Sequence, residues 1–244
     1  MSEHVGVVIP ARNEQELIAR CLDSVMDARA RAGVPVTVVV VADACTDETA
    51  EVAERYSDVM VLRITDGSVG AARILGSGVA LDRGCTWLAH TDADSVVPAN
   101  WITEQLMLAD AGYDVVIGTV QPDFADLSTA HVEQWLATHE RGRPNGHVHG
   151  ANLGVRAATF VAAGGFARLD EHEDNELVAR LVAAQAAIIA TDTCEVLTSG
   201  RLLGRTAGGY AGHLRMIAAE LEQSSRLVLA SRGSKFDSRV SGFE

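Results

Sequence analysis

Largely apolar runs alternate with amphipathic segments along the first half of this chain. Such runs are typical of buried strands, and the helical spacing of apolar residues between them predicts intervening helices. The alternation indicates βαβ units, and therefore an α/β fold with a parallel, doubly wound sheet in this half. The predicted strands are Val5 to Ile9, Val36 to Val41, Val59 to Ile64, Trp87 to His90 and Val115 to Val120.

Four helices are expected between these strands. The first has a capping pattern, with Asn13 as the cap and Glu16 three residues later, and it ends before Gly33. Each helix connects two strands of the sheet. The other three are predicted to start at Thr46 or Asp47, to span about 69–81 and to span about 100–111.

The pattern of the second half is less regular. Here we expect helices over about 128–140 and 158–163, one that starts near Glu173, and one over about 210–230. Strands are expected over about 150–155 and 187–190, and a mobile loop over 141–149. Residues 231–244 are polar, and we expect them to be a disordered tail.

Composition narrows the class of protein. The net charge of -13 argues against a nucleic-acid partner, which would need a basic face. The four cysteines form no Cys-x-x-Cys pair and no signal peptide is evident, so we expect reduced thiols in the cytoplasm. No segment is long and apolar enough to be a transmembrane helix. The chain is therefore expected to be soluble, or at most peripheral to a membrane.

Two carboxylates follow the fourth predicted strand, in the stretch Asp92-Ala93-Asp94. Alternate residues of an extended chain point the same way, so both can project from the strand's end. Two nearby carboxylates repel unless a cation or a proton lies between them, which favours a hard divalent metal. Asp residues are also common in the turn after a strand, and this second interpretation remains open.

A second group of acids opens the helix expected near Glu173. Asp174 lies three and four positions before Leu177 and Val178, so it would face inward with them. A carboxylate on the buried side is a candidate general base. Glu173 is expected on the solvent side with Glu176 and Arg180. The alternative is that these acids only complement the helix dipole.

Other reaction classes fit less well. A phosphatase with an Asp nucleophile would also place Asp92 and Asp94 after a strand, but the usual position is the first strand and the mechanism uses a lysine. The chain has one lysine, Lys235, in its tail. The same scarcity excludes a Walker loop, and the glycines make no Gly-x-Gly-x-x-Gly between a strand and a helix.

Taken together, seven motifs occur in the order found in family-two glycosyltransferases, and the chain resembles that family over roughly residues 5–210. The motifs are Val7-Val8-Ile9-Pro10-Ala11-Arg12-Asn13-Glu14, Val40-Val41-Ala42-Asp43-Ala44-Cys45-Thr46-Asp47-Glu48-Thr49, Gly70-Ala71-Ala72-Arg73, Asp92-Ala93-Asp94, Gly150-Ala151-Asn152-Leu153, Gly164-Gly165-Phe166 and Glu173-Asp174. The resemblance implies a GT-A-type, Rossmann-like fold with a mostly parallel central sheet flanked by helices, in a single domain. It also implies an inverting transferase that uses a nucleoside-diphosphate sugar and Mg²⁺ or Mn²⁺.

The resemblance assigns nucleotide contacts in the first half. It implies that Pro10, Ala11 and Glu14 border the base and ribose, although an aromatic residue often stands where this chain has Ala11. Asp43 would accept the imide N–H of the base, which favours uracil over cytosine, while guanine and thymine also offer that donor. Arg73 would lie near the base or the phosphates.

It also assigns the metal and the base. Asp94 would ligate the metal, with Asp92 on the ribose or on a metal-bound water. Asp174, in the catalytic pair with Glu173, would take the proton of the acceptor hydroxyl.

Several residues of the second half are further candidates for the site. Arg201 and Arg205 could clamp the diphosphate, because arginine gives bidentate contacts to phosphate oxygens, although surface ion pairing would explain them equally well. His147, His149 and His213 could reach the metal or the acceptor, but a histidine in a loop is more often simply solvated.

We therefore expect one glycosyltransferase domain over residues 1–230, with a nucleotide-binding half (1–120) and an acceptor-side half (121–230). The acceptor would be a small molecule or a lipid-linked one. The alternatives are a metal-dependent phosphatase or nucleotidyltransferase, and a nucleotide-sugar-binding module without catalytic activity.

Overall fold

The computed structural model describes residues 3–204 and 209–219. Contacts group the chain into two compact units. The larger unit comprises Met1–Asp123 and His139–Ser199, and the smaller one comprises Phe124–Thr138 and Gly200–Glu244. The predicted tail 231–244 and residues 220–230 of the helix predicted over 210–230 lie outside the described residues.

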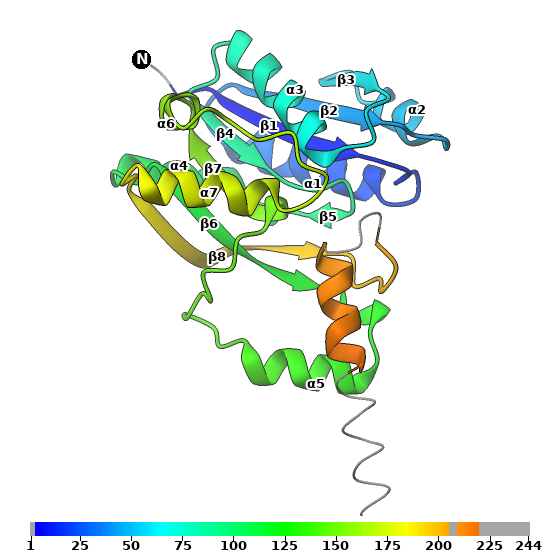
Figure 1. Cartoon of the computed structure of the whole chain (residues 1–244). Helices are drawn as coiled ribbons and strands as arrows, with labels where there is room; N and C mark the ends of the chain where they lie inside the picture. Colours follow the sequence, from blue (N-terminus) through cyan, green and yellow to red (C-terminus); the bar gives the residue numbers. More distant parts are fainter. Residues whose placement is uncertain (1–2, 205–208, 220–244) are drawn as a thin grey trace, which may run out of the picture. The chain divides into compact units, whose positions relative to one another are not determined.

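The larger unit is built on an eight-stranded sheet of order β3-β2-β1-β4-β7-β6-β8-β5 (Figure 1). The strands β1 to β4 are parallel to one another, as predicted for the first half. The strands are β1 Val5–Ala11, β2 Val36–Asp43, β3 Val59–Ile64, β4 Trp87–His90, β5 Ser95–Val96, β6 Val115–Pro122, β7 Leu153–Arg156 and β8 Ile188–Thr198.

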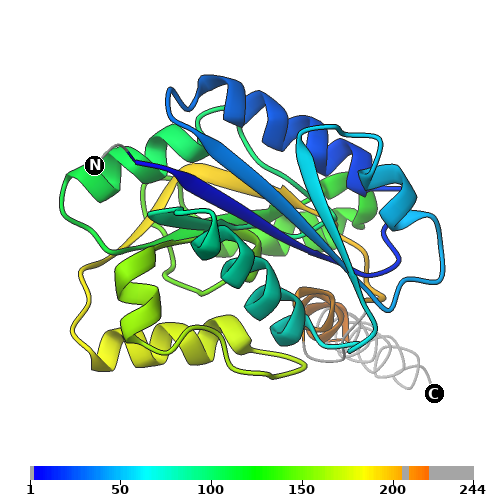
Figure 2. The same cartoon turned by 90° about the horizontal axis from the view of Figure 1, so that it is seen from above.

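Helices cover both faces of this sheet. Figure 2 shows α1 and α4 on one face and α3, α6 and α7 on the other. No helix in the described part of the chain is long and apolar enough to cross a membrane. The helices of the larger unit are α1 Ile18–Arg31, α2 Thr49–Ala53, α3 Val69–Asp82, α4 Trp101–Asp110, α6 Ala157–Ala162 and α7 Glu173–Ala183, with a 3-10 turn, η2, at Gly150–Asn152.

Small residues explain how closely α3 approaches the sheet. A Cβ on Gly6 of β1 would lie 2.6 Å from the Cβ of Ala80, and one on Gly76 would lie 2.5 Å from Cγ1 of Val8. Real Cβ atoms do not pack at such distances, so these glycines let the helix backbone rest almost directly on β1. This close packing fixes the start of α3 near the carboxyl ends of the parallel strands.

The order of the second half differs from a simple parallel continuation. β7 lies antiparallel between β4 and β6, and β6 pairs in parallel with β8. The fifth predicted strand, β6, is therefore not a direct neighbour of β4. The strand predicted over 187–190 also continues to Thr198, where β5 pairs with it. Apolar runs identify strands but do not specify which strands become neighbours.

The first two helices begin later than predicted. Helix α1 starts after Leu17, and Asn13 is not its cap: it has φ 54°, and its Oδ1 accepts the N–H of Thr46 at 2.7 Å. Helix α2 starts at Thr49, whose N–H donates to Oδ1 of Asp47 at 3.1 Å. Polar residues expected to cap helices instead tie the loops after β1 and β2 to each other.

The buried amide of Asn152 connects η2 to α4, β6 and β8. Oδ1 of Asn152 accepts the indole N–H of Trp101, while its Nδ2 donates to the carbonyls of Thr119 and Cys194, all at 2.9 Å. A Cβ on Gly118 would lie 2.1 Å from this Nδ2, so only glycine fits there. The residues predicted as the start of a strand at 150–152 form η2 because Asn152 is held by these bonds.

The smaller unit contains the turn η1 Phe124–Asp126, helix α5 Thr129–Thr138 and helical residues 210–219. The rings of Phe124 and Trp135 pack edge to face, with centroids 5.3 Å apart. Arg215 donates to the carbonyl of Leu202 at 2.7 Å.

Candidate active site

Acidic side chains gather at one edge of the sheet in the larger unit. The parallel strands β1, β2 and β4 end there, and the start of β7 lies at the same edge because Leu153 pairs with His90. The carboxyl ends of parallel strands are where ligands bind in open α/β sheets. This edge therefore holds the candidate site.

The loop after β1 provides the first side of the site. Pro10 and Ala11 are the last residues of β1, and Ala11 and Glu14 are buried. The N–H of Glu14 donates to Oγ1 of Thr49 at the start of α2, at 2.7 Å. Pro10, Ala11 and Glu14 are thus held beside the end of β2. Their predicted contacts with the nucleotide stay a prediction.

Asp43 ends β2 and is 3% exposed. Its Oδ1 accepts the N–H of Gly67 and its Oδ2 that of Ser68, both at 2.7 Å. Ser68 directly precedes α3, so Asp43 connects the end of β2 to the start of that helix. A carboxylate has about four lone-pair sites, so these two bonds leave it capacity for the imide N–H proposed from the sequence.

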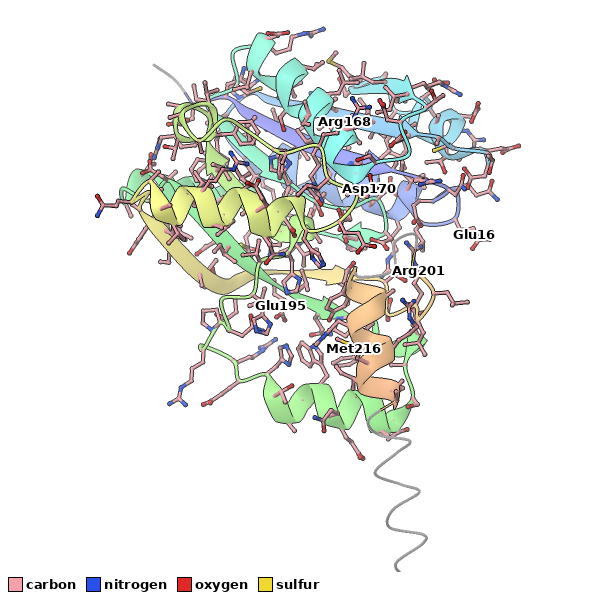
Figure 3. All side chains as sticks on the ribbon, in the orientation of Figure 1. Glu16, Arg168, Asp170, Glu195, Arg201 and Met216 are labelled. Carbon is pink, nitrogen blue, oxygen red and sulfur yellow. The ribbon has the colours of Figure 1, made fainter. Side chains whose placement is uncertain are left out.

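The loop before α7 is also fixed to the start of α3. The N–H of Gly70 donates to the carbonyl of Leu169 at 3.0 Å, and Arg168 pairs with Asp66. Figure 3 labels Arg168 and Asp170 on this loop, beside the start of α3. The loop therefore places the start of α7 at the edge of the sheet where the parallel strands end.

Asp92 and Asp94 lie in the turn between β4 and β5, and both are partly exposed. Oδ1 of Asp92 accepts from Nη2 of Arg73 at 2.6 Å. Oδ1 of Asp94 lies 3.4 Å from the hydroxyls of both Ser95 and Thr198, which donate to it. β4 ends before these acids, so they belong to a turn rather than to the strand itself, and they have different neighbours.

Asp174 is partly exposed in the first turn of α7. Its Oδ2 accepts the N–H of Gly150 at 2.6 Å, and its Oδ1 accepts the N–H of Asn175 at 2.7 Å. Gly150 opens η2, just before β7. Two backbone donors thus hold this carboxylate at the edge where the parallel strands end.

The prediction that Glu173 lies on the solvent side of α7 is wrong. Its side chain is buried, and its Oε1 accepts from Nε of Arg73 at 2.8 Å. Burial raises the pKa of Glu173, and the charge of Arg73 opposes that rise. The predicted pair between Glu176 and Arg180 is present, at 2.7 Å. The sequence held one hint of this ion pair. Arg73 is a charged residue in a helix of small residues, and a buried charge needs an acidic partner.

His90 is the last residue of β4, two positions before Asp92, and it is fully buried. Its ring is 4.9 Å from that of Phe166, edge to face. Burial, with a smaller contribution from the Arg73 cation, holds the pKa of His90 well below its usual value. His90 is therefore neutral at pH 7, and Arg73 is the cation that the acids contact.

The remaining sequence candidates are two arginines and three histidines of the second half. Arg201 belongs to the smaller unit, as does His213, and Arg205 lies outside the described residues. In the larger unit, the rings of His147 and His149 are 6.4 Å apart, just before Gly150. Their predicted roles stay predictions.

The oxygen donors of Asp92 and Asp94 suit a hard metal ion. Among residues 3–204 and 209–219, no three His, Cys, Asp or Glu side chains form a group that could hold one. Mg²⁺ is usually bound by one or two carboxylates and completes its shell with water and substrate phosphates. The two acids therefore fit a metal that is bound jointly with a diphosphate.

The sequence motifs and this geometry agree with a comparison against protein families. The model named "Glycosyl transferase family 2" matches residues 6–168. The chain belongs to glycosyl transferase family 2. The 4,4'-diaponeurosporenoate glycosyltransferase of Staphylococcus aureus (strain USA300) is 29% identical over 183 residues, or 68% of this chain and 47% of the relative. The chain thus spans about half the length of the curated relatives it matches.

Solved structures of TarS from S. aureus are similar to this chain in fold. TarS of S. aureus (residues 1–349) superposes with a TM-score of 0.61 at 17% identity, over 81% of this chain and 60% of that one. The complex of the same protein with UDP-GlcNAc gives 0.62 at 16% identity, over 89% and 66%. These similarities confirm the predicted GT-A-type α/β fold.

Proposed function

We propose that this family 2 protein transfers a sugar from a nucleoside-diphosphate sugar to a hydroxyl group, with inversion at the anomeric carbon. The observation that supports this most is the position of Asp174. Backbone N–H groups hold its partly exposed carboxylate at the sheet edge that also carries Asp43, Asp92 and Asp94.

In the proposed reaction, Asp174 is the general base. Its carboxylate takes the proton of the acceptor hydroxyl while that oxygen attacks the anomeric carbon, and the bond from this carbon to the diphosphate oxygen breaks. A single displacement of this kind inverts the anomeric centre and releases the nucleoside diphosphate. The bonds from Gly150 and Asn175 orient the base before the acceptor arrives.

The donor we propose is a UDP-sugar. Asp43, supported by the start of α3, would accept the imide N–H of uracil, and Pro10, Ala11 and Glu14 would line the base and ribose. The TarS structures with UDP-GlcNAc and with UDP support this choice. For the acceptor, we propose a small or lipid-linked hydroxyl compound.

Mg²⁺ or Mn²⁺ is proposed as the cofactor, held by Asp94 and by Asp92. Such an ion neutralises the negative charge that develops on a departing diphosphate. The role of the two acids is to fix its place at the end of β4, while Arg73 restrains Asp92.

A thermal-shift experiment tests the donor. We expect Mn²⁺ with UDP at about 100 times its Kd to raise the Tm by roughly 5–10 °C, since a ligand that binds only the folded state stabilises it. GDP, TDP and CDP serve as the comparison, and EDTA replaces Mn²⁺ in the control. Equal shifts with all four nucleotides, or the same shift with EDTA, would contradict the proposed donor or the proposed metal, respectively.

A further inference from the structure

Arg73 is a buried cation in the middle of the candidate site. It lies on α3, among small and apolar residues, and its side chain is 2% exposed. Burial by itself lowers the pKa of a guanidinium, but Asp92 and Glu173 outweigh this effect, and the pKa of Arg73 is raised. The residue is therefore a permanent positive charge whose position depends on its acidic partners.

The two acids that Arg73 contacts come from opposite sides of the site. Its Nε donates to Oε1 of Glu173 on α7 at 2.8 Å, and its Nη2 donates to Oδ1 of Asp92 after β4 at 2.6 Å. Asp92 belongs to the proposed metal and donor side, and Glu173 to the side of the proposed base. One guanidinium thus joins the two sides directly.

Arg73 also contacts Gly150, whose N–H binds the proposed general base, Asp174. Glu173 immediately precedes Asp174 in the first turn of α7. A Cβ on Gly150 would lie 2.4 Å from Nη2 of Arg73, so this nitrogen packs against the glycine whose N–H binds Asp174. Arg73 therefore contacts both the residue beside the base and its backbone anchor.

Only arginine suits this position. The guanidinium is planar and offers several donors in fixed directions, whereas lysine is a point charge on a flexible stem. Here two nitrogens are committed to different acids, and the guanidinium carbon lies 5.9 Å from the ring centroid of Phe166. A lysine could pair with Asp92 or Glu173 but could not hold both in the same geometry.

We propose that Arg73 is a positioning residue, which fixes the distance between Asp92 and Asp174 by binding Asp92 and Glu173 at once. This inference rests on the proposed function, because it assigns those acids to the donor and to the base. Arg73 acts through its neighbours and does not itself transfer a proton. The predicted contact of Arg73 with the nucleotide stays a prediction.

A double-mutant cycle on Arg73 and Glu173, measured by thermal unfolding, tests the link between the two sides. We expect Arg73→Met and Glu173→Gln each to lower the Tm, by about 10 °C for Arg73→Met, because a buried charge loses its partner. The double variant should lose clearly less than the sum of the two losses, since neither charge remains. Additive losses would overturn the proposed link, whatever the activity of the protein. Glu173→Gln carries the test if Arg73→Met does not fold.

Activity separates positioning from stability. With UDP-glucose, UDP-galactose and UDP-GlcNAc as donors, we expect Glu173→Gln and the double variant to release UDP about 100-fold more slowly than wild type, because small misplacements of reacting groups are costly. For Glu173→Gln, which keeps Arg73 and its bond to Asp92, UDP binding should change less than about threefold, so the loss falls on kcat. Even where the Tm of the double variant is higher than the two single losses together would give, its release of UDP should remain slow.

Arg156→Met is the matched control. Arg156 pairs with Asp114 at 3.0 Å at the opposite edge of the sheet, so its loss should lower the Tm without slowing UDP release. Wild-type turnover in the double variant would overturn the positioning role. Failure of the wild type with every donor would contradict the proposed function instead, and the double-mutant cycle would then decide the claim about Arg73.

Discussion

Replacing Asp174 with Asn is expected to reduce the transfer rate by about 10²–10⁴-fold, the usual contribution of a general base. The amide has a single oxygen, which can keep the bond from either Gly150 or Asn175 but not both, and it cannot take a proton. A loss of stability is therefore expected, and the Tm of the variant is measured beside its rate. UDP affinity should stay within about threefold of wild type, because the base faces the acceptor. The measurements are kcat from UDP release and Kd from calorimetry.

Glu176→Gln is the control for this variant. Glu176 lies in the same first turn of α7 but pairs with Arg180, at partial exposure. We expect near wild-type turnover and a small loss of stability, since exposed pairs contribute little. A rate for Asp174→Asn within about threefold of wild type would rule out its role as the base.

Asp94→Asn is expected to weaken Mn²⁺-dependent binding of UDP by at least about tenfold, because a proposed ligand of the metal is lost. The change keeps the size of the side chain, and Ser95 and Thr198 can still donate to its oxygen. Calorimetry with UDP should therefore show a large effect with Mn²⁺ and a small one with EDTA.

Asp82→Asn controls for the loss of one negative charge. Asp82 is exposed at the far end of α3, so we expect no change in UDP affinity. Equal UDP affinity of Asp94→Asn and wild type in Mn²⁺ would remove Asp94 from the metal site.

The first half of the fold was largely predictable, because a buried parallel strand leaves a direct trace in the sequence. Apolar runs located β1 to β4, and the alternation with helices correctly predicted parallel pairing. The insertion of β7 between β4 and β6 was not predictable in the same way. It depends on tertiary interactions, among them the three hydrogen bonds of Asn152, which connect segments far apart in the chain.

The candidate site shows the same division. Asp43, Asp92 and Asp94 could be assigned to one edge because each lies at the end of a parallel strand or shortly after it. Glu173 could not, since helical spacing relates it to Glu176 and Arg180 but carries no information about Arg73. Local periodicity identifies neighbours within a helix, whereas a buried ion pair between helices is a property of the packed structure.

The release of UDP from UDP-sugars tests the central claim most directly. Purified protein is incubated with Mn²⁺ and UDP-glucose, UDP-galactose or UDP-GlcNAc, and UDP and inorganic phosphate are measured. We predict release of UDP from at least one donor, abolished by EDTA and reduced by Asp174→Asn. UDP binding without release would instead indicate a nucleotide-sugar-binding module, and phosphate as the product a phosphatase. Either result would contradict the proposed transferase.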